Sequence, residues 1–303
     1  MAKRGTYGQF VSNLILRGAL GAALALPYRW RVPLMGWFTS RIASPLAGYG
    51  RRIRANLALV CPDLQEAEIK ALCRSVPDNV GRSLIEIYSG DDFAKRAASH
   101  EIEGPGLAAL ERARAEGRPV VLVTGHFGNY DAPRAALIAR GFDLGALYKP
   151  MGNPYFNAHY ERAIAKIGEP IFPKDRRGIA DMLRFLKGGG VLGFFIDNHV
   201  GTGEQVDFFN HPAWTTLAAA EMALKQDALI LMVFGVRQPD GLTFRIVINA
   251  PIEHTTAIEM TQELTNQLEE MVRQHMDQWL WIHRRWKDSA VTPTVPPQES
   301  DRD

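Results

Sequence analysis

The residue types best suited to chemistry lie at the end of one apolar run. Residues 120–124 read Val-Val-Leu-Val-Thr, a pattern that predicts a buried strand, and Gly125 ends it. His126 follows, where α/β folds present reactive groups. Asp131 comes five residues later, in the first turn of a helix that we expect to start near Asn129. A histidine held by such a carboxylate is suited to act as a general base on a hydroxyl.

Other polar side chains also follow predicted strands. Lys149, Arg177 and Asp197 each come after an apolar segment of strand-like composition. If those strands are parallel, their carboxyl ends meet at the edge where ligands bind in open α/β sheets. Ammonium and guanidinium groups there suit phosphate oxygens, although exposed lysine and arginine are more often solvated surface. Thr215 fits a site residue and a helix cap equally well.

The tract around His126 resembles a known signature. His-x4-Asp after a strand is similar to the signature of the glycerolipid acyltransferase superfamily, and Gly-His-Phe-Gly-Asn-Tyr-Asp resembles its lipid A biosynthesis late acyltransferase branch, the lauroyl and myristoyl transferases. Further blocks follow in the branch's order: Tyr148–Pro154, Lys174–Gly178, Leu186–Gly190, Val206–Phe209 and Gln278–Lys287. The resemblance covers most of the chain after its N-terminal segment.

The resemblance implies an activity and roles for particular residues. The branch moves a fatty acyl chain from acyl carrier protein to a hydroxyl of a lipid A precursor at the cytoplasmic face of the inner membrane. His126 is then the general base and Asp131 orients its ring. No metal or cofactor is implied. The residues that the branch's pattern places around the substrate are Lys149, Asn153, Arg177, Asp197 and Thr215.

Two other classes of function use the same residue types. His126, Asp131, Asp197 and His199 are all of types that ligate zinc, so a metal-dependent hydrolase is one alternative, although nothing in their spacing requires a metal. A catalytically silent protein that binds acidic lipid is another. Within acyl transfer, a lysophospholipid or glycolipid is an alternative acceptor.

The first 62 residues differ in charge from the rest. They carry nine Lys or Arg and no acid, so the overall charge of +2 leaves −7 for the remainder. A basic arm on an acidic body favours docking to an anionic surface. Its apolar stretch, residues 10–27, contains Arg17, which an interfacial helix tolerates better than a membrane span. We therefore predict an arm that lies on the membrane; a single span or a secretory signal peptide are the alternatives.

Composition excludes several further classes. Cys61 and Cys73 are too few for a disulfide framework, which favours a reducing compartment. The basic residues of the arm are separated by long Leu and Ala runs, which fits lipid better than nucleic acid.

The alternation of strand and helix patterns predicts an α/β fold, a mostly parallel sheet flanked by helices. We expect residues 1–62 to form the arm, residues 63–290 the domain that the resemblance identifies as an acyltransferase, and residues 291–303 a disordered tail. Gln238–Gly241 predicts a turn between two antiparallel strands at one sheet edge. Predicted strands span 119–124, 144–148, 170–172, 191–196, 228–236 and 244–248; predicted helices span 62–88, 106–116, 129–140, 155–167, 178–187, 215–225 and 261–286.

Overall fold

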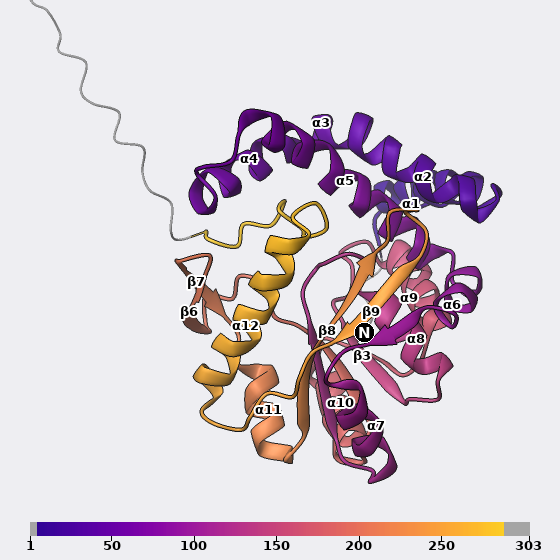
Figure 1. The fold of residues 1–303 in the computed structure, drawn as a ribbon. Coiled ribbons are helices and arrows are strands. Elements are labelled where there is room, and N and C mark those ends of the chain that lie inside the picture. The colour runs from indigo at the N-terminus through magenta and orange to yellow at the C-terminus, as the bar shows by residue number, and fades with distance from the viewer. Residues whose placement is uncertain (1–4, 288–303) are drawn as a thin grey trace, which may run out of the picture.

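The computed structural model describes residues 5–287 and contains, within them, a seven-stranded sheet covered by helices on both faces (Figure 1). The order is β1-β9-β8-β2-β5-β3-β4, and β6 and β7 form a separate hairpin. The strands are β1 (Glu101–Glu103), β2 (Val120–Thr124), β3 (Leu144–Tyr148), β4 (Ile171–Pro173), β5 (Val191–Phe195), β6 (Glu204–Phe208), β7 (His211–Thr215), β8 (Leu229–Arg237) and β9 (Phe244–Ile248). The predicted α/β class is confirmed. The tail predicted at 291–303 lies outside the described residues.

Five adjacent strands, β8, β2, β5, β3 and β4, run parallel, and β9 is antiparallel to β8. The predicted hairpin between β8 and β9 is therefore confirmed, but its place at the edge is wrong. β1 pairs with β9 on the outside. A three-residue strand gives too short an alternation to be read from sequence.

The helices before the sheet are α1 (Tyr7–Leu24), α2 (Tyr28–Phe38), η1 (Thr39–Ala43), α3 (Ser44–Ala47), α4 (Tyr49–Val60), α5 (Glu66–Tyr88) and α6 (Asp91–Ala97). Those within and after it are α7 (Leu107–Ala115), α8 (Asp131–Ala139), α9 (Pro154–Ile167), α10 (Arg176–Lys187), α11 (Ala218–Gln226) and α12 (Ala257–Gln274). Among the described helices, none combines the length and the apolar character that a membrane crossing requires.

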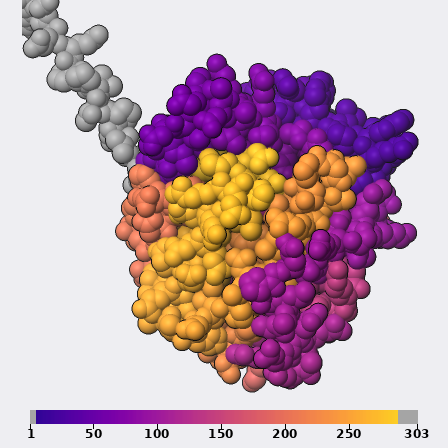
Figure 2. Space-filling view, viewed as in Figure 1, coloured from indigo at the N-terminus to yellow at the C-terminus, as the bar shows by residue number. Residues whose placement is uncertain are grey.

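The first helices form a layer across one end of the molecule (Figure 2). Twelve of the seventeen large apolar side chains that are exposed in the described residues lie in this layer, so they are concentrated rather than scattered. We call them the N-terminal face: Tyr7, Phe10, Val11, Leu14, Ile15, Leu16, Trp30, Leu34, Trp37, Phe38, Ile42 and Leu46.

The central strand shows why both faces of the sheet are covered. Val121 and Val123 of β2 point into one hydrophobic cluster, which α5, α11 and α12 share. Val120 and Leu122 point into the other, which α8 and α9 share. Successive side chains of a strand alternate between faces, so an unbroken apolar run needs a core on each side.

Two predicted helices have different bounds. The last one ends at Gln274 instead of continuing to Trp286, because residues 278–280 hydrogen-bond to the loop after β2 rather than to their own helix. The helix predicted from Thr215 begins at Ala218, and Thr215 is the last residue of β7. The hairpin of β6 and β7 was not predicted.

Candidate active site

His126 lies in a tight loop between β2 and α8, at the carboxyl end of the parallel strands. Gly128 has φ +54°, and a Cβ there would lie 2.0 Å from the carbonyl oxygen of Gly235. A Cβ on Gly125 would lie 3.2 Å from a carboxylate oxygen of Asp197. The two glycines therefore let the loop pass close to β8 and to Asp197. Its backbone is fixed by neighbours on both sides.

The ring of His126 is held by Asp197, which follows β5. Its Nδ1 lies 2.8 Å from one carboxylate oxygen of Asp197, and its backbone N–H donates to the other at 2.6 Å. The indole N–H of Trp279 also donates to Asp197, at 3.0 Å. Burial alone would raise the pKa of the Asp197 carboxyl, but the charge and hydrogen bonds of His126 hold it well below its usual range.

A charged Asp197 fixes the tautomer of the ring. A carboxylate can only accept, so Nδ1 carries the proton and Nε2 keeps its lone pair. Within residues 5–287, no protein group hydrogen-bonds to Nε2. The ring stacks on Phe195 with centroids 4.4 Å apart, and its side chain is 22% exposed. This is the arrangement of a general base: one nitrogen oriented, the other available.

Asp131 is not the carboxylate at Nδ1, which corrects the predicted pairing. Its carboxylate lies 3.5 Å from Arg134, and its backbone N–H donates to the side chain of Asn129. Burial raises the pKa of Asp131, an effect that Arg134 opposes. The local spacing favoured Asp131, whereas the strand order places Asp197 against the loop, because β5 is the parallel neighbour of β2.

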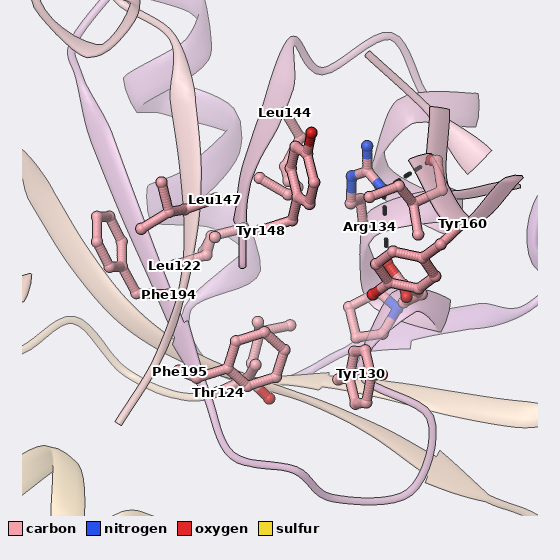
Figure 3. A pocket seen from close by; sticks show the side chains of 16 residues that line it. Leu122, Thr124, Tyr130, Arg134, Leu144, Leu147, Tyr148, Tyr160, Phe194 and Phe195 are labelled. Carbon is pink, nitrogen blue, oxygen red and sulfur yellow. Dashed lines mark hydrogen bonds and ion pairs between the residues drawn. The ribbon is translucent and has the colours of Figure 1, made fainter. Parts of the chain in front are cut away.

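Asp131 lines a cavity whose wall includes Tyr130 and Phe195, two rings in contact with the ring of His126. Figure 3 shows this cavity with both rings. The cavity has a volume of about 80 Å³ and lies between the sheet and the helices α8 and α9. One side is polar, with Tyr160 close to the ion pair of Arg134 and Asp131, and the remaining wall is mainly apolar. The apolar side chains come from β2, β3, β5, α9 and β8: Leu122, Leu144, Leu147, Ile164, Phe194, Phe195 and Val233.

A second cavity, of about 140 Å³, includes His126 in its wall. It lies between α5 and the segment after α12, with Val76, Val80 and Leu84 on one side and Leu280 on the other. Tyr130 lines both cavities. The second cavity therefore borders His126 directly, and the first adjoins it through Tyr130.

The segment 275–287, which we call the C-terminal segment, forms another wall. Trp279 pairs with Phe127 through a β-bridge, and the backbone N–H of Leu280 donates to the carbonyl of His126 at 3.0 Å. The ring of His283 lies 4.8 Å from that of His126, centroid to centroid. The resemblance includes this block without a role for His283, and the structure brings that residue to the site.

A buried ion pair between β8 and α5 supports the loop that carries His126. Arg237 on β8 donates two hydrogen bonds, each 2.7 Å, to the carboxylate of Glu86 on α5. Glu86 also accepts from Asn129 at 2.8 Å, and Ser83 donates to the carbonyl of Gly128 at 2.8 Å. Sequence reasoning missed this network. A Glu inside an amphipathic helix gives no signal that its partner lies 151 residues away.

Two predicted substrate residues lie at the expected edge but stand apart from the ring. Lys149 follows β3 and is exposed; Arg177, in the first turn of α10, is 93% exposed and lies 3.9 Å from Asp181. In the described part of the chain, no ion pair or hydrogen bond joins either one to His126, Asp131 or Asp197. Their role in binding stays a prediction.

Two other predicted residues have structural contacts. Asn153 caps α9 by accepting from the backbone of Tyr155 and Phe156, and its amide donates to the carbonyl of Gln9 at 2.8 Å. Thr215 is buried; its hydroxyl donates to the carbonyl of Ala213 and accepts from Arg285. Both positions are thus occupied by contacts within the protein.

The predicted zinc-ligand types were also tested. Among residues 5–287, no group of three or more His, Cys, Asp or Glu side chains is arranged to hold a metal ion. Asp197 is instead bonded to His126 and Trp279. The donor set around His126 is that of a base and its orienting carboxylate.

Comparisons with known proteins cover this whole arrangement. Residues 7–288 match the sequence profile described as Bacterial lipid A biosynthesis acyltransferase. The lipid A biosynthesis lauroyltransferase of Escherichia coli (strain K12) is 24% identical over 249 residues, 78% of this chain and 78% of that protein. The myristoyltransferase of the same organism is 23% identical over 296 residues, 92% and 88% of the two chains, and its palmitoleoyltransferase 23% over 283 residues, 90% of each. The matched residues include every side chain of the site.

Proposed function

The chain belongs to the bacterial lipid A biosynthesis acyltransferase family, and from that premise we propose that it moves a fatty acyl chain from acyl carrier protein to a hydroxyl of a lipid A precursor. One observation carries the proposal: the ring of His126 is bonded to buried Asp197 through Nδ1, which leaves Nε2 available. That geometry suits removal of a hydroxyl proton near neutral pH.

The reaction has two steps: the acceptor oxygen attacks the thioester carbon, and the carrier thiolate leaves. Nε2 of His126 takes the proton as the acceptor oxygen bonds to the thioester carbon. The tetrahedral intermediate then collapses, the C–S bond breaks, and the carrier thiolate takes the proton back from the imidazolium. Asp197 stabilises that imidazolium and does not itself become protonated. No serine or cysteine in the described residues hydrogen-bonds to His126, which favours direct transfer over an acyl-enzyme.

The apolar cavity beside Asp131 supports a long-chain substrate. Its wall of Leu, Ile, Val and Phe side chains begins next to the catalytic ring. Each methylene buried there contributes about 0.8 kcal/mol, so a few carbons of chain length change the binding free energy measurably. We assign this cavity to the acyl chain of the donor.

The lipid acceptor and the carrier protein both carry negative charge, which suits the basic groups on the surface of the protein. Phosphate groups of the acceptor suit Lys149 and Arg177, each able to form a charge-assisted contact worth about 1.5–3 kcal/mol. The acidic carrier protein suits the exposed basic residues of the arm and Arg284 or Lys287 in the C-terminal segment.

We place the protein at the cytoplasmic face of the inner membrane. The N-terminal face combines exposed apolar side chains with arginines, in a segment without a single acid. Tryptophan and arginine are residue types that sit at the headgroup level of a bilayer. A lipid acceptor is then available without leaving the membrane.

A transfer assay tests the proposal. Purified protein, acyl carrier protein charged with a radiolabelled acyl chain, and a hydroxylated lipid A precursor should yield labelled ester and free carrier thiol in equal amounts. Release of free fatty acid in place of ester would show a hydrolase. Absence of any turnover over a range of acyl lengths and acceptors would contradict acyl transfer by this chain.

A further inference from the structure

His283 is a second histidine beside the reacting centre, and the mechanism above does not use it. Its ring lies 4.8 Å from that of His126, tilted by 60°. Its backbone is fixed, because its N–H donates to Leu280 at 3.1 Å and its carbonyl accepts from Asn56 of α4 at 2.7 Å. The side chain is therefore held next to the base from another part of the fold.

The ring nitrogens of His283 are left for a substrate. Across residues 5–287, neither of them hydrogen-bonds to a protein atom, although the residue is half-buried. Two histidines away from the site differ: His211 and His254 each place Nε2 about 3 Å from a backbone carbonyl. His283 is not used to support the fold through its ring.

The surroundings of His283 favour the neutral form of its ring. Burial lowers the pKa of its ring, and the adjacent His126 and Arg285 lower it further, against the opposing effect of Asp197. A neutral imidazole offers one N–H donor and one acceptor. It can therefore donate a hydrogen bond without adding a second positive charge beside His126.

Acyl transfer also needs a hydrogen-bond donor to the carbonyl oxygen of the thioester. Attack on the thioester places negative charge on the carbonyl oxygen, and enzymes meet that charge with preorganised N–H groups. Four backbone amides of the loop are already bonded: that of His126 to Asp197, that of Phe127 to Gly125, that of Gly128 to Gln278 and that of Asn129 to Gly235. The indole N–H of Trp279 is bonded to Asp197. None of these five N–H groups is free to donate to the oxyanion, whereas the ring of His283 has no hydrogen-bond partner in the described part of the chain.

We propose that His283 is a catalytic residue that donates its ring N–H to the thioester carbonyl oxygen as that oxygen becomes an oxyanion. The two rings are in contact, with centroids 4.8 Å apart, so a thioester group that reaches Nε2 of His126 also comes beside the ring of His283. When the hydroxyl oxygen bonds to the carbon, the C=O pair moves to the oxygen, which His283 stabilises. When the C–S bond breaks, the pair returns to the C=O bond, and His283 keeps its proton throughout. The inference rests on the proposed acyl transfer.

The test compares three variants with the wild type in the transfer assay. His283→Phe, which keeps a ring without a donor, should lower kcat by about 10²–10³ while the KM values of donor and acceptor stay within about twofold. His283→Gln, which restores an N–H, should recover about tenfold of that loss. His283→Ala carries the same expectation as Phe and decides the matter if the Phe variant does not fold. His254→Gln, outside the site, should keep wild-type kcat.

Several results would overturn the assignment. A Phe or Ala variant with wild-type kcat, a Gln variant no better than Phe or Ala, or losses confined to KM would each show that His283 only shapes the pocket. Failure of the proposed function is distinguishable, because the wild type itself would then give no ester. Thermal melts of the variants identify a loss that is due to unfolding.

Discussion

His126 depends on a residue that is distant in sequence and adjacent in space. Asp197 is 71 positions away and bonds to both the ring and the backbone of His126. Asp131 is five positions away and bonds to Arg134. At the scale of single residues, we therefore infer that Asp197 sets the tautomer of His126. Asp131 lies instead in the wall of the cavity that we propose for the acyl chain.

The two carboxylates can be compared directly. Asp197→Asn removes the charge that keeps the proton on Nδ1, so we expect kcat to fall by about 10²–10⁴. Asp131→Asn keeps the shape of the cavity wall and should cost clearly less, with its effect in the KM of the donor. Steady-state kinetics of both variants decide this. A larger kcat loss for Asp131→Asn would restore the carboxylate that sequence spacing favoured.

Single residues show what can be predicted from the sequence and what cannot. The position of His126 follows from a local pattern, a strand that ends at Gly125. The partner of its ring could not be predicted, because Asp197 lies beside His126 only through the order of strands in the sheet. The resemblance assigned no role to His283, and only the fold brings its ring to His126.

At the scale of elements, α5 and β8 hold the loop of His126 through Glu86 and Arg237. Both side chains are nearly inaccessible, at 0% and 7% exposure, and both also bond to residues next to the loop. Removing one partner of a buried pair leaves an uncompensated charge, which costs far more than the loss of a surface pair.

A matched pair of variants tests this support. Arg237→Met should lower the free energy of unfolding by about 3–5 kcal/mol. It should also reduce activity, because the loop of His126 loses the ion pair that supports it. Arg245→Met breaks the half-exposed pair with Glu103, on the neighbouring strand, and should cost at most about 1 kcal/mol. Urea unfolding measures both. Equal losses for the two variants would contradict the supporting role of the buried pair.

Elements with a clear periodicity were predicted from sequence, and those defined by distant contacts were not. The predicted strand bounds of β3 and β9 match the structure. The hairpin of β6 and β7 was missed, because its residues alternate charged, apolar and aromatic types without a long apolar run. The C-terminal segment has a helix-like apolar content, but its hydrogen bonds go to the loop of His126, which ends α12 at Gln274.

At the scale of the whole molecule, twelve exposed apolar side chains and the unbalanced positive charge lie in the same N-terminal segment. The helices of that segment form the layer across one end of the molecule in Figure 2. α1 is also attached to the helices that cover the sheet, since Asn153 at the start of α9 donates to Gln9. A layer that touched a bilayer would thus hold the rest of the protein at a fixed distance from it.

Vesicle binding tests that placement. Ile15→Glu puts a charge on the N-terminal face, where the side chain is 66% exposed, and should release the protein several-fold from anionic vesicles. Ile179→Glu, on α10, should not. High salt should partly release the wild type, because attraction to anionic lipid is screened over about 8 Å at physiological ionic strength. Extraction only by detergent, at every salt concentration, would contradict an arm that lies on the surface and favour a single N-terminal crossing.

The central claim is that the free nitrogen of His126 removes the proton of the acceptor hydroxyl, and His126→Ala measures it most directly. Ester formation from acyl carrier protein to the lipid acceptor is followed in the wild type and in the variant, with thermal melts of both. The account predicts a loss of about 10²–10⁴ in kcat with an unchanged fold and unchanged vesicle binding. Near-normal turnover in a properly folded variant would contradict it.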